Sequence, residues 1–263
     1  MFRLFLKTLR DKRYFILGWS LGMGFLAFVM TVFYPSFSGG QIDSLLDTIP
    51  TALQGLVGNI QDWRELPGYI GSQVFDIRLP IFISILSILL AISLTVGEED
   101  KGELRTLVSQ PVSRRAIVLG KWLAILAICF IASAASILGV EIGLLAINES
   151  LDQTVLVRLG LFTWLLVTAL ASLIFAVGLA TGKRSLTTAV AVIVAIGSFL
   201  MSTFSQAVDW LKEWEFVSFF HYFPATDIAK GTVEWMNVWV YAGITVISLG
   251  IALLAFVRRD IKS

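Results

Sequence analysis

Six long apolar stretches constrain this chain more than any other feature of its sequence. A helix that crosses a bilayer needs about 20 mostly apolar residues. The composition agrees with such a chain, because 57% of the 263 residues are hydrophobic and only 15% are charged, unlike a soluble globular domain. The sequence therefore predicts an all-α integral membrane protein, one transmembrane domain over residues 1–263 with six transmembrane helices. The expected spans are roughly 14–34, 77–96, 116–147, 155–181, 186–205 and 238–257.

Basic residues are unevenly divided between the two sides of the membrane that six spans define. Six spans place both termini on one side, together with the 97–115 loop and the turn at 182–185. Fifteen of the 20 Lys and Arg residues belong to this side, and the positive-inside rule makes it cytoplasmic. We expect a multi-pass protein of the inner or plasma membrane with cytoplasmic N- and C-termini. The fifteen are Arg3, Lys7, Arg10, Lys12, Arg13, Lys101, Arg105, Arg114, Arg115, Lys121, Lys183, Arg184, Arg258, Arg259 and Lys262.

Residues 2–12 precede the first span and have an amphipathic pattern. Phe2, Phe5, Leu6 and Leu9 recur at the spacing of one helical face, while the basic residues fall on other faces. This pattern predicts an interfacial helix that lies on the inner membrane surface, where membrane lipid is its partner.

Two loops on the opposite side also carry apolar residues. In the first, an apolar face on both sides of Pro50 predicts two short helices. The last loop, 206–237, is rich in aromatic residues, and it either dips into the bilayer or rests on the outer surface. The sequence favours neither arrangement, although backbone that dips must be covered by protein.

The loop 97–115 between the second and third spans has its own short helical pattern. Leu104, Leu107 and Val108 form an apolar stripe on a helix that begins near Gly102 and ends before Pro111. Such a helix is too short to be stable alone in water, so its stripe needs the membrane surface or another protein as partner. The alternative is a solvated loop whose charges only set the topology. Four charged residues flank the helix and are suited to orient it by charge pairing: Glu98, Glu99, Arg114 and Arg115.

A longer run that includes this loop resembles the signature of a known family. The run is similar to that of the permease subunits of bacterial and archaeal ABC-type exporters of the second superfamily, which are ABCG-like with a type V fold. The interfacial helix, the six spans and the long loop before the last span are also similar to that family, so the likeness covers nearly the whole chain. The residues that carry it are Glu98, Glu99, Gly102, Leu104, Leu107, Ser109, Pro111, Val112, Ser113, Arg114, Gly120 and Lys121.

The resemblance implies a division of labour between subunits. The 97–115 loop would contain a coupling helix that docks on a separate ABC ATP-binding subunit, and two permease chains, identical or sister chains, would pair with two such subunits. The docking residues implied are Glu98, Glu99, Gly102, Leu104, Leu107, Val108, Pro111 and Arg114. The chain itself is then not an enzyme. Because the family consists mostly of exporters, we expect export, and the apolar spans suggest a hydrophobic or amphipathic substrate.

The chain has no motif for binding ATP by itself. A phosphate-binding loop needs G-x-x-x-x-G-K-[ST] after a strand. The nearest sequence, GLATGKRS at 178–185, has one residue too few between its glycines and places Arg184 after the lysine. We therefore expect no cofactor in this chain, with ATP and Mg²⁺ on the partner subunit.

One pair of charged residues is predicted within the membrane. Glu141 in the third span and Arg158 in the fourth lie at similar depth below the outer surface, which predicts an intramembrane ion pair. Its role is either structural or that of lining a substrate or proton path. Two further patterns, GVEIG at 139–143 and GLATG at 178–182, permit close approach between helices.

Other classes of protein fit the sequence less well. His221 is the only histidine, so neither a metal site nor an intramembrane protease of the CAAX type is expected. A net charge of +1 gives no reason to expect a nucleic-acid partner. An ion-coupled secondary carrier and a non-transporting membrane sensor or scaffold remain as alternatives to the ABC permease.

Overall fold

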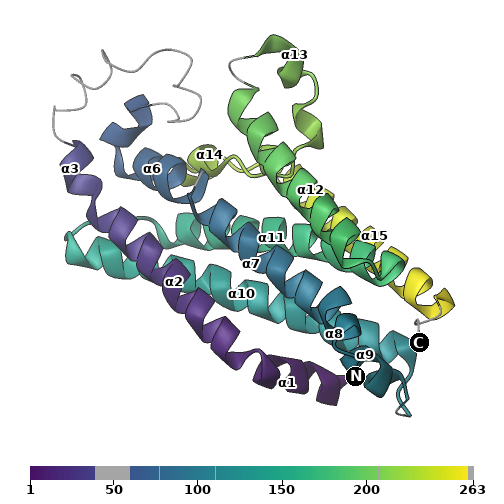
Figure 1. The fold of residues 1–263 in the computed structure, drawn as a ribbon. Helices are drawn as coiled ribbons and strands as arrows, with labels where there is room; N and C mark the ends of the chain where they lie inside the picture. The colour runs from purple at the N-terminus through teal and green to yellow at the C-terminus, as the bar shows by residue number, and fades with distance from the viewer. Residues whose placement is uncertain (39–59, 77, 110, 206–207, 260–263) are drawn as a thin grey trace.

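The computed structural model describes residues 1–38, 60–76, 78–109, 111–205 and 208–259, and every regular element in these ranges is a helix (Figure 1). Among them are six helices long and apolar enough to cross a membrane, as predicted. They are α2 (Arg13–Val32), α7 (Arg78–Leu94), α10 (Arg114–Ala146), α11 (Gln153–Thr181), α12 (Arg184–Phe204) and α15 (Met236–Arg258). The two short helices predicted around Pro50 lie outside the described residues.

The second apolar stretch is helical over a longer range than its predicted start at residue 77 suggests. Helical structure begins at Leu66, because α6 (Leu66–Tyr69) and the π-helical turn η2 (Ile70–Asp76) precede α7, with residue 77 outside the described residues. All of η2 except its last residue is buried. These turns are packed inside the protein. The sequence assigned them to the outer loop, because their hydrophobicity alone does not distinguish a buried helical turn from a loop.

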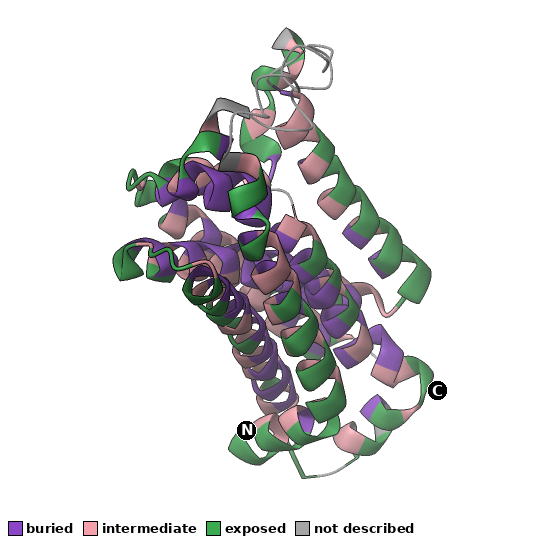
Figure 2. Ribbon diagram, turned by 90° about the vertical axis from the view of Figure 1, so that its left-hand side faces the viewer, coloured by how far each residue is buried: buried purple, intermediate pink, exposed green. Residues whose placement is uncertain are grey.

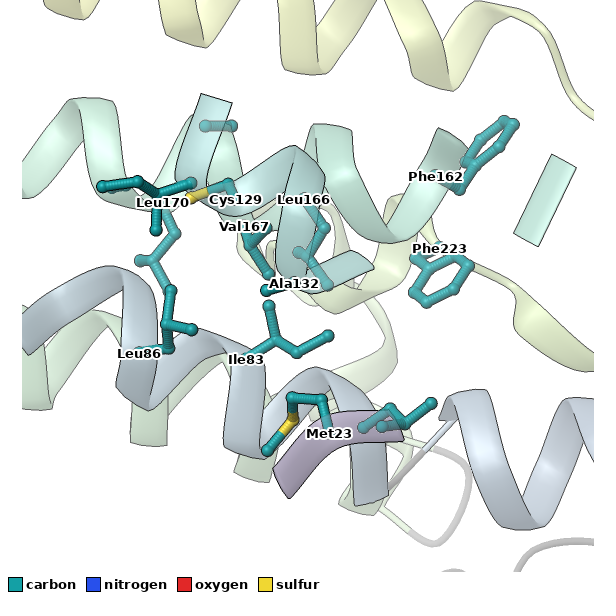
Figure 3. Packing of buried hydrophobic residues seen from close by; sticks show 14 of the residues in the cluster. Met23, Ile83, Leu86, Cys129, Ala132, Phe162, Leu166, Val167, Leu170 and Phe223 are labelled. Carbon is teal, nitrogen blue, oxygen red and sulfur yellow. The ribbon is translucent and has the colours of Figure 1, made fainter. Parts of the chain in front are cut away.

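The helices differ strongly in how much of their surface the protein itself covers. The most apolar part of the Leu66–Asp100 stretch, which contains α7, is 67% buried, as is that of α11, against 17% for α2 and α12 and 28% for α15. Figure 2 shows this contrast between a buried centre and exposed outer helices. Ile83, Leu86, Leu166 and Leu170 are among the core side chains that α7 and α11 direct toward each other (Figure 3). The outer helices therefore present mostly apolar side chains to their surroundings.

Close packing between α2 and α10 depends on glycine. A Cβ at Gly139 would overlap the backbone carbonyl of Gly24, and one at Gly143 would lie 2.7 Å from Cβ of Thr31. Contacts this short are not available to other residues, so the glycines let the two helix backbones approach. This confirms that the GVEIG sequence at 139–143 mediates a close helix contact.

The bundle has a charged end and a far end. At the charged end lie both termini, α1 (Phe2–Asp11), α8 (Val96–Asp100) and α9 (Glu103–Val108), as Figure 1 shows. At the far end lie α3 (Tyr34–Ser38), η1 (Ile60–Arg64), α6, α13 (Asp209–Lys212), η3 (Glu215–Val217), η4 (Phe220–Tyr222) and α14 (Ala225–Ala229). The segments predicted to share one side therefore gather at one end.

The first helix is separate from the first span, as predicted. α1 ends at Asp11 and α2 begins at Arg13, with the break at Lys12. Phe2 and Leu6 are 68% and 47% exposed, which leaves apolar surface available to a membrane. The placement of α1 on the inner surface of that membrane stays a prediction.

Candidate functional site

The chain between α7 and α10 forms two short helices joined by a turn. Gly102 lies between α8 and α9 with a φ of 74°, a left-handed conformation that glycine adopts without steric cost. The short helix predicted to begin near Gly102 and to end before Pro111 is confirmed as α9. Ser113 then caps α10, because its side chain accepts a hydrogen bond of 3.2 Å from a backbone N–H in the first turn of that helix.

Glu98 in α8 pairs with a buried lysine of α10. Lys121 Nζ lies 2.6 Å from Glu98 Oε2 and donates a second hydrogen bond of 2.8 Å to the carbonyl oxygen of Leu94. Leu94 ends α7, so the ammonium group also satisfies a carbonyl that lacks a partner within its helix. Lys121 is 1% exposed, and a buried charge requires partners of this kind. The contact fixes the junction of α7 and α8 against α10.

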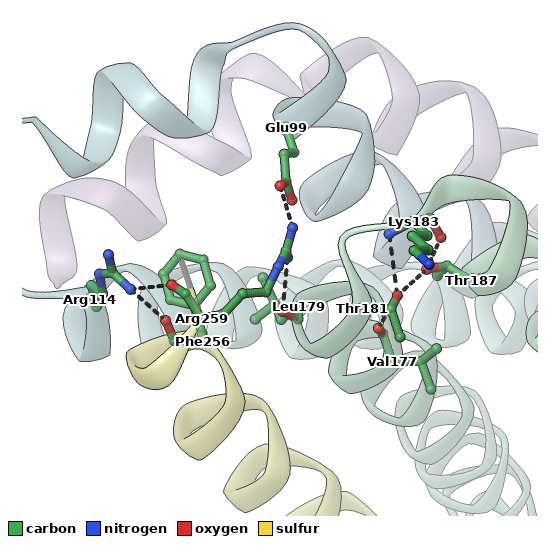
Figure 4. Close-up of polar contacts among 9 residues, drawn as sticks. All are labelled: Glu99, Arg114, Val177, Leu179, Thr181, Lys183, Thr187, Phe256 and Arg259. Atoms are coloured by element: carbon green, nitrogen blue, oxygen red, sulfur yellow. Dashed lines mark hydrogen bonds and ion pairs between the residues drawn. The ribbon is translucent and has the colours of Figure 1, made fainter. Parts of the chain in front are cut away.

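Glu99 pairs with Arg259, the residue that follows α15. Arg259 Nη2 contacts Glu99 Oε1, and Arg259 Nη1 donates a hydrogen bond of 3.1 Å to the carbonyl oxygen of Leu179 (Figure 4). The side chains of the arginine and the glutamate are only 15% and 13% exposed. Because Leu179 lies in the last turn of α11, one guanidinium group joins α8, α11 and the end of α15.

Gly182 makes room for this guanidinium group. It ends α11 with a φ of 59°, the left-handed conformation in which glycine commonly terminates a helix. A Cβ at this position would overlap the guanidinium group of Arg259. Gly178, one turn earlier, is also closely approached, because a Cβ there would lie 2.4 Å from Oγ1 of Thr95. Both glycines of the GLATG sequence at 178–182 therefore serve close contacts.

Asp100 completes a set of three consecutive acids with partners. Its carboxylate lies 3.5 Å from Nη1 of Arg184, the first residue of α12, and this pair is largely exposed. We call Glu98, Glu99 and Asp100 the acid triplet. Its members contact α10, the residue after α15 and the start of α12, so one turn of helix is tied to three spans.

Arg114, at the start of α10, binds the C-terminal end of α15. Its Nη1 donates to the carbonyl oxygens of Phe256 at 3.0 Å and Arg259 at 2.6 Å (Figure 4). The carbonyl oxygen of Val257 lies 3.3 Å from the same nitrogen. A cation at a helix C-terminus satisfies carbonyls without helical partners and interacts favourably with the helix dipole. The guanidinium group also lies 5.9 Å from the centre of the Phe256 ring. Arg114 is therefore an internal cap.

Gly120, which precedes the buried lysine, is the contact point of α1. A Cβ there would lie 3.2 Å from the carbonyl oxygen of Met1 and 3.2 Å from Cδ2 of Leu4. The Gly-Lys pair at 120–121 thus has two structural roles, since the glycine leaves room for α1 and the lysine binds α8.

A cleft of about 460 Å³ opens beside this contact, between α1 and α9. Its lining includes Lys7, Lys12, Lys101, Glu103, Thr106 and Leu107.

The charged residues predicted to dock a partner are engaged within the chain. Glu98 and Glu99 pair with Lys121 and Arg259, and Arg114 caps α15. The physical reason is that the basic residues of the charged end come from several helices, and the fold brings them onto the acids. Sequence alone interpreted Arg184 and Arg259 as topology signals. The three consecutive acidic residues at 98–100 indicated that basic partners are needed. The sequence does not show which basic residues those partners are.

The apolar docking residues divide between the core and the surface. Leu104 is 0% exposed, and Leu107 is partly buried against the core. Gly102 is partly exposed and Pro111 is exposed, while the side chain of Val108 lies outside the described set. An apolar stripe indicates that a face is buried but does not identify what buries it. Here the bundle covers Leu104.

The predicted ion pair between Glu141 and Arg158 is not formed. Gln153, at the start of α11, donates to Glu141 Oε1. Arg158 Nη1 instead lies 3.5 Å from the carbonyl oxygen of Gly231. Similar depth in the membrane was not sufficient for pairing, because the hairpin turn brings the first residue of α11 to Glu141 and directs Arg158 toward the loop after α14.

Within the described ranges, no group of three His, Cys, Asp or Glu side chains is arranged to hold a metal ion.

Comparison with known proteins places this geometry in a family. Residues 4–261 match the family described as "ABC-2 family transporter protein". No individual curated protein matches the chain in sequence. The matched range includes α9, the acid triplet, the six long helices, Arg114 and Arg259.

Proposed function

This chain belongs to the ABC-2 family of transporter proteins, as the non-catalytic membrane permease component, and from that premise we propose how it is driven. ABC-2 permeases work with ATP-binding subunits. In our proposal such a subunit docks on the 97–115 loop at the charged end, which faces the cytoplasm, and the permease exports a hydrophobic or amphipathic substrate. ATP and Mg²⁺ are then bound by the partner.

The acid triplet is the observation that carries this proposal. A docked subunit can drive transport only if the loop that it contacts moves the spans. Glu98, Glu99 and Asp100 connect that loop to α10, α15 and α12. α8 also follows α7 after the single residue Thr95, so a displacement of α8 acts on four spans at once.

The three pairs differ in exposure, which suggests how such a displacement proceeds. The side chains of Asp100 and Arg184 are 48% and 64% exposed, whereas Lys121 is 2% and Glu98 15% exposed. Exposed pairs contribute about 0–1 kcal/mol, but a buried pair is costly to break. The Asp100 pair therefore opens first and lets α12 shift, while α8 stays attached to α10. ATP binding and hydrolysis supply the energy because they change which of the two states of the permease, with the Asp100 pair closed or open, the partner subunit binds more tightly.

The docking surface in this proposal is smaller than the sequence suggested. It consists of exposed residues at the end of α9, in the following turn and at the start of α10: Thr106, Ser109, Pro111, Val112 and Arg115. Thr106 also lines the neighbouring cleft. Because Glu98, Glu99, Leu104 and Arg114 serve internal contacts, they act on docking only by holding α9 in place.

A second permease chain completes the transporter in this proposal. The outer helices α2, α12 and α15 are poorly covered by the chain itself, and this apolar surface is available to lipid and to a second copy or sister chain.

Purification of the tagged chain from its native membrane in a mild detergent tests this function. We expect an ATP-binding subunit in roughly equal amount, and loss of that subunit from Pro111→Asp, since a charge is placed in the docking surface. Glu149→Lys, an exposed change at the far end, is the matched control and should retain it. Leu104→Asp is unsuitable because it would unfold the core. Recovery of the chain without any ATPase, or equal recovery with Pro111→Asp, would contradict the proposed docking.

A further inference from the structure

An apolar groove lies between α1, α10 and α11 at the charged end of the bundle. Its volume is about 430 Å³, which is within the range of sites that hold small ligands. Phe2 and Phe5 of α1 form one wall, and their rings stack with centres 6.1 Å apart. The lining continues with Leu123, Ala127 and Phe130 of α10 and Trp164 of α11.

The chemistry of the lining fits hydrocarbon. All the lining residues that the structure describes have apolar side chains. The one N–H among these side chains, that of the Trp164 indole, donates a hydrogen bond of 3.0 Å to the carbonyl oxygen of Leu126. The Trp164 ring also meets Phe130 edge to face, with ring centres 5.9 Å apart. Because a polar group placed here would lose its hydrogen bonds with water, the groove suits an apolar chain.

The groove is open toward the surroundings of the bundle. Phe2 and Phe130 are 68% and 58% exposed, whereas Leu123, Ala127 and Trp164 are half-buried. Ala127 has only a methyl group, so it leaves space between the larger side chains around it. Exposed apolar surface that is hollowed in this way marks a ligand groove or a site of membrane contact. In a protein that spans a membrane, the bilayer itself can supply the ligand.

The length of the groove matches the thickness of one leaflet. α1 crosses α10 at Gly120, where a Cβ would lie 3.2 Å from the carbonyl oxygen of Met1. At about 1.5 Å per residue, Phe130 is about 15 Å further along α10. Half of the hydrocarbon core of a bilayer is also about 15 Å thick. With α1 at the headgroup boundary, as its amphipathic pattern predicts, a chain that follows α10 to Phe130 reaches the middle of the bilayer.

Positive charge lies beside the end of the groove that α1 forms. Arg3 directly follows Phe2, and Arg10 lies about two turns later on the same face of α1. Both arginines are exposed. Guanidinium groups bind phosphate through paired hydrogen bonds, and basic residues at a membrane surface attract anionic lipid. An apolar groove with a basic entrance is therefore complementary to a lipid that has an acyl chain and a negatively charged headgroup.

We propose that this groove is a binding site for one anionic phospholipid from the leaflet at the charged end. One acyl chain lies in the groove between α1 and α10, and the phosphate of the headgroup contacts Arg3. Such a site differs from the general contact of an amphipathic helix with lipid, because three helices hold one molecule in one place. The proposal needs only that the spans cross a membrane, so it is independent of ATP-driven transport.

Lipid titration of the purified full-length chain, followed by native mass spectrometry, tests the proposal. Dioleoyl phosphatidylglycerol is compared with dioleoyl phosphatidylcholine, which has the same acyl chains and no net charge. We expect one phosphatidylglycerol to bind about tenfold more tightly than phosphatidylcholine. Equal affinity for the two lipids would overturn the proposal, because the headgroup would then not be recognised.

Two sets of variants separate the groove from the charge. Ala127→Phe fills the groove and should lower the affinity for phosphatidylglycerol about tenfold. Ala189→Phe, the same exchange at an exposed position near the start of α12, is the matched control and should retain it. Arg3→Gln with Arg10→Gln, which changes only exposed side chains, should remove the preference between the lipids. All variants must match the unmodified chain in size-exclusion profile and thermal unfolding. Unchanged affinity in Ala127→Phe would overturn the proposal.

A second measurement locates the bound lipid. Phosphatidylglycerol with a photoreactive diazirine in its acyl chain is irradiated with the chain in vesicles, and the attachment sites are mapped by peptide mass spectrometry. Attachment concentrated in residues 123–130 and in α1 supports the proposal. Attachment spread evenly over α2, α12 and α15 would overturn it, because lipid would then only surround the bundle. Absence of attachment in residues 123–130 would overturn it as well, because protein, such as a second copy of the chain, would then cover the groove.

Discussion

The guanidinium group of Arg259 occupies the space that a side chain at residue 182 would fill, and Gly182 leaves that space open. Through this contact the residue after α15 reaches both Leu179 at the end of α11 and Glu99 in α8. A single glycine at a helix end thus permits an ion pair between segments that are 160 residues apart in sequence.

Replacing Gly182 by alanine should disrupt this contact. Alanine is strained at a φ of 59°, at a cost of about 1–3 kcal/mol, and its methyl group also displaces Arg259. We expect a lower unfolding temperature in detergent and loss of the Glu99 pair. Gly197→Ala, in α12 with open space around it, is the control. Equal unfolding temperatures for the two variants would argue against the packing role of Gly182.

Removing one partner of the Glu98–Lys121 pair should be more harmful than removing both. Glu98→Gln leaves the buried ammonium of Lys121 without its counter-charge, which costs about 3–5 kcal/mol for a buried pair. Lys121→Met combined with Glu98→Gln removes that penalty, so the double variant should recover much of the lost stability. A double-mutant cycle of chemical unfolding measures the coupling. Additive effects would show that the two side chains do not interact.

The Asp100–Arg184 pair should affect coupling more than stability. Because the pair is exposed, Asp100→Asn should change unfolding by less than about 1 kcal/mol. In vesicles that contain the complete transporter, we expect this variant to retain ATP hydrolysis while transporting less per ATP. Exchanging the charges with Asp100→Arg and Arg184→Asp should restore part of the ratio. An unchanged ratio in Asp100→Asn would exclude α12 from the proposed transmission.

The contact between α2 and α10 should not tolerate a methyl group at Gly139. The added Cβ overlaps the carbonyl oxygen of Gly24, and overpacking of this kind costs about 1–3 kcal/mol. Thermal unfolding of Gly139→Ala is therefore expected at lower temperature than that of the unmodified chain. Gly22→Ala, which has nothing within 4 Å of the added Cβ, should have little effect. Similar losses from both would mean that helix flexibility, not packing, is responsible.

The sequence predicted the elements whose signal is local. Hydrophobic length identified six helices, amphipathic spacing identified α1, and the stretch from Gly102 to Pro111 identified α9. The glycine patterns at 139–143 and 178–182 also indicated close contacts correctly. Each of these depends on residues within a few helical turns, so neighbouring side chains carry enough information to predict it.

Tertiary structure alone decided which charges meet. From the sequence we interpreted Glu98, Glu99 and Arg114 as residues that contact a partner subunit. In the structure they contact Lys121, Arg259 and the end of α15, respectively. The sequence predicted an ion pair between Glu141 and Arg158. In the structure Glu141 contacts Gln153, and Arg158 contacts the carbonyl oxygen of Gly231. Charged side chains pair over distances of a few ångströms, and the chain segments that bring them so close can be more than a hundred residues apart. The sequence therefore determined the spans and the segments that share an end, whereas helix packing determined the contacts within that end.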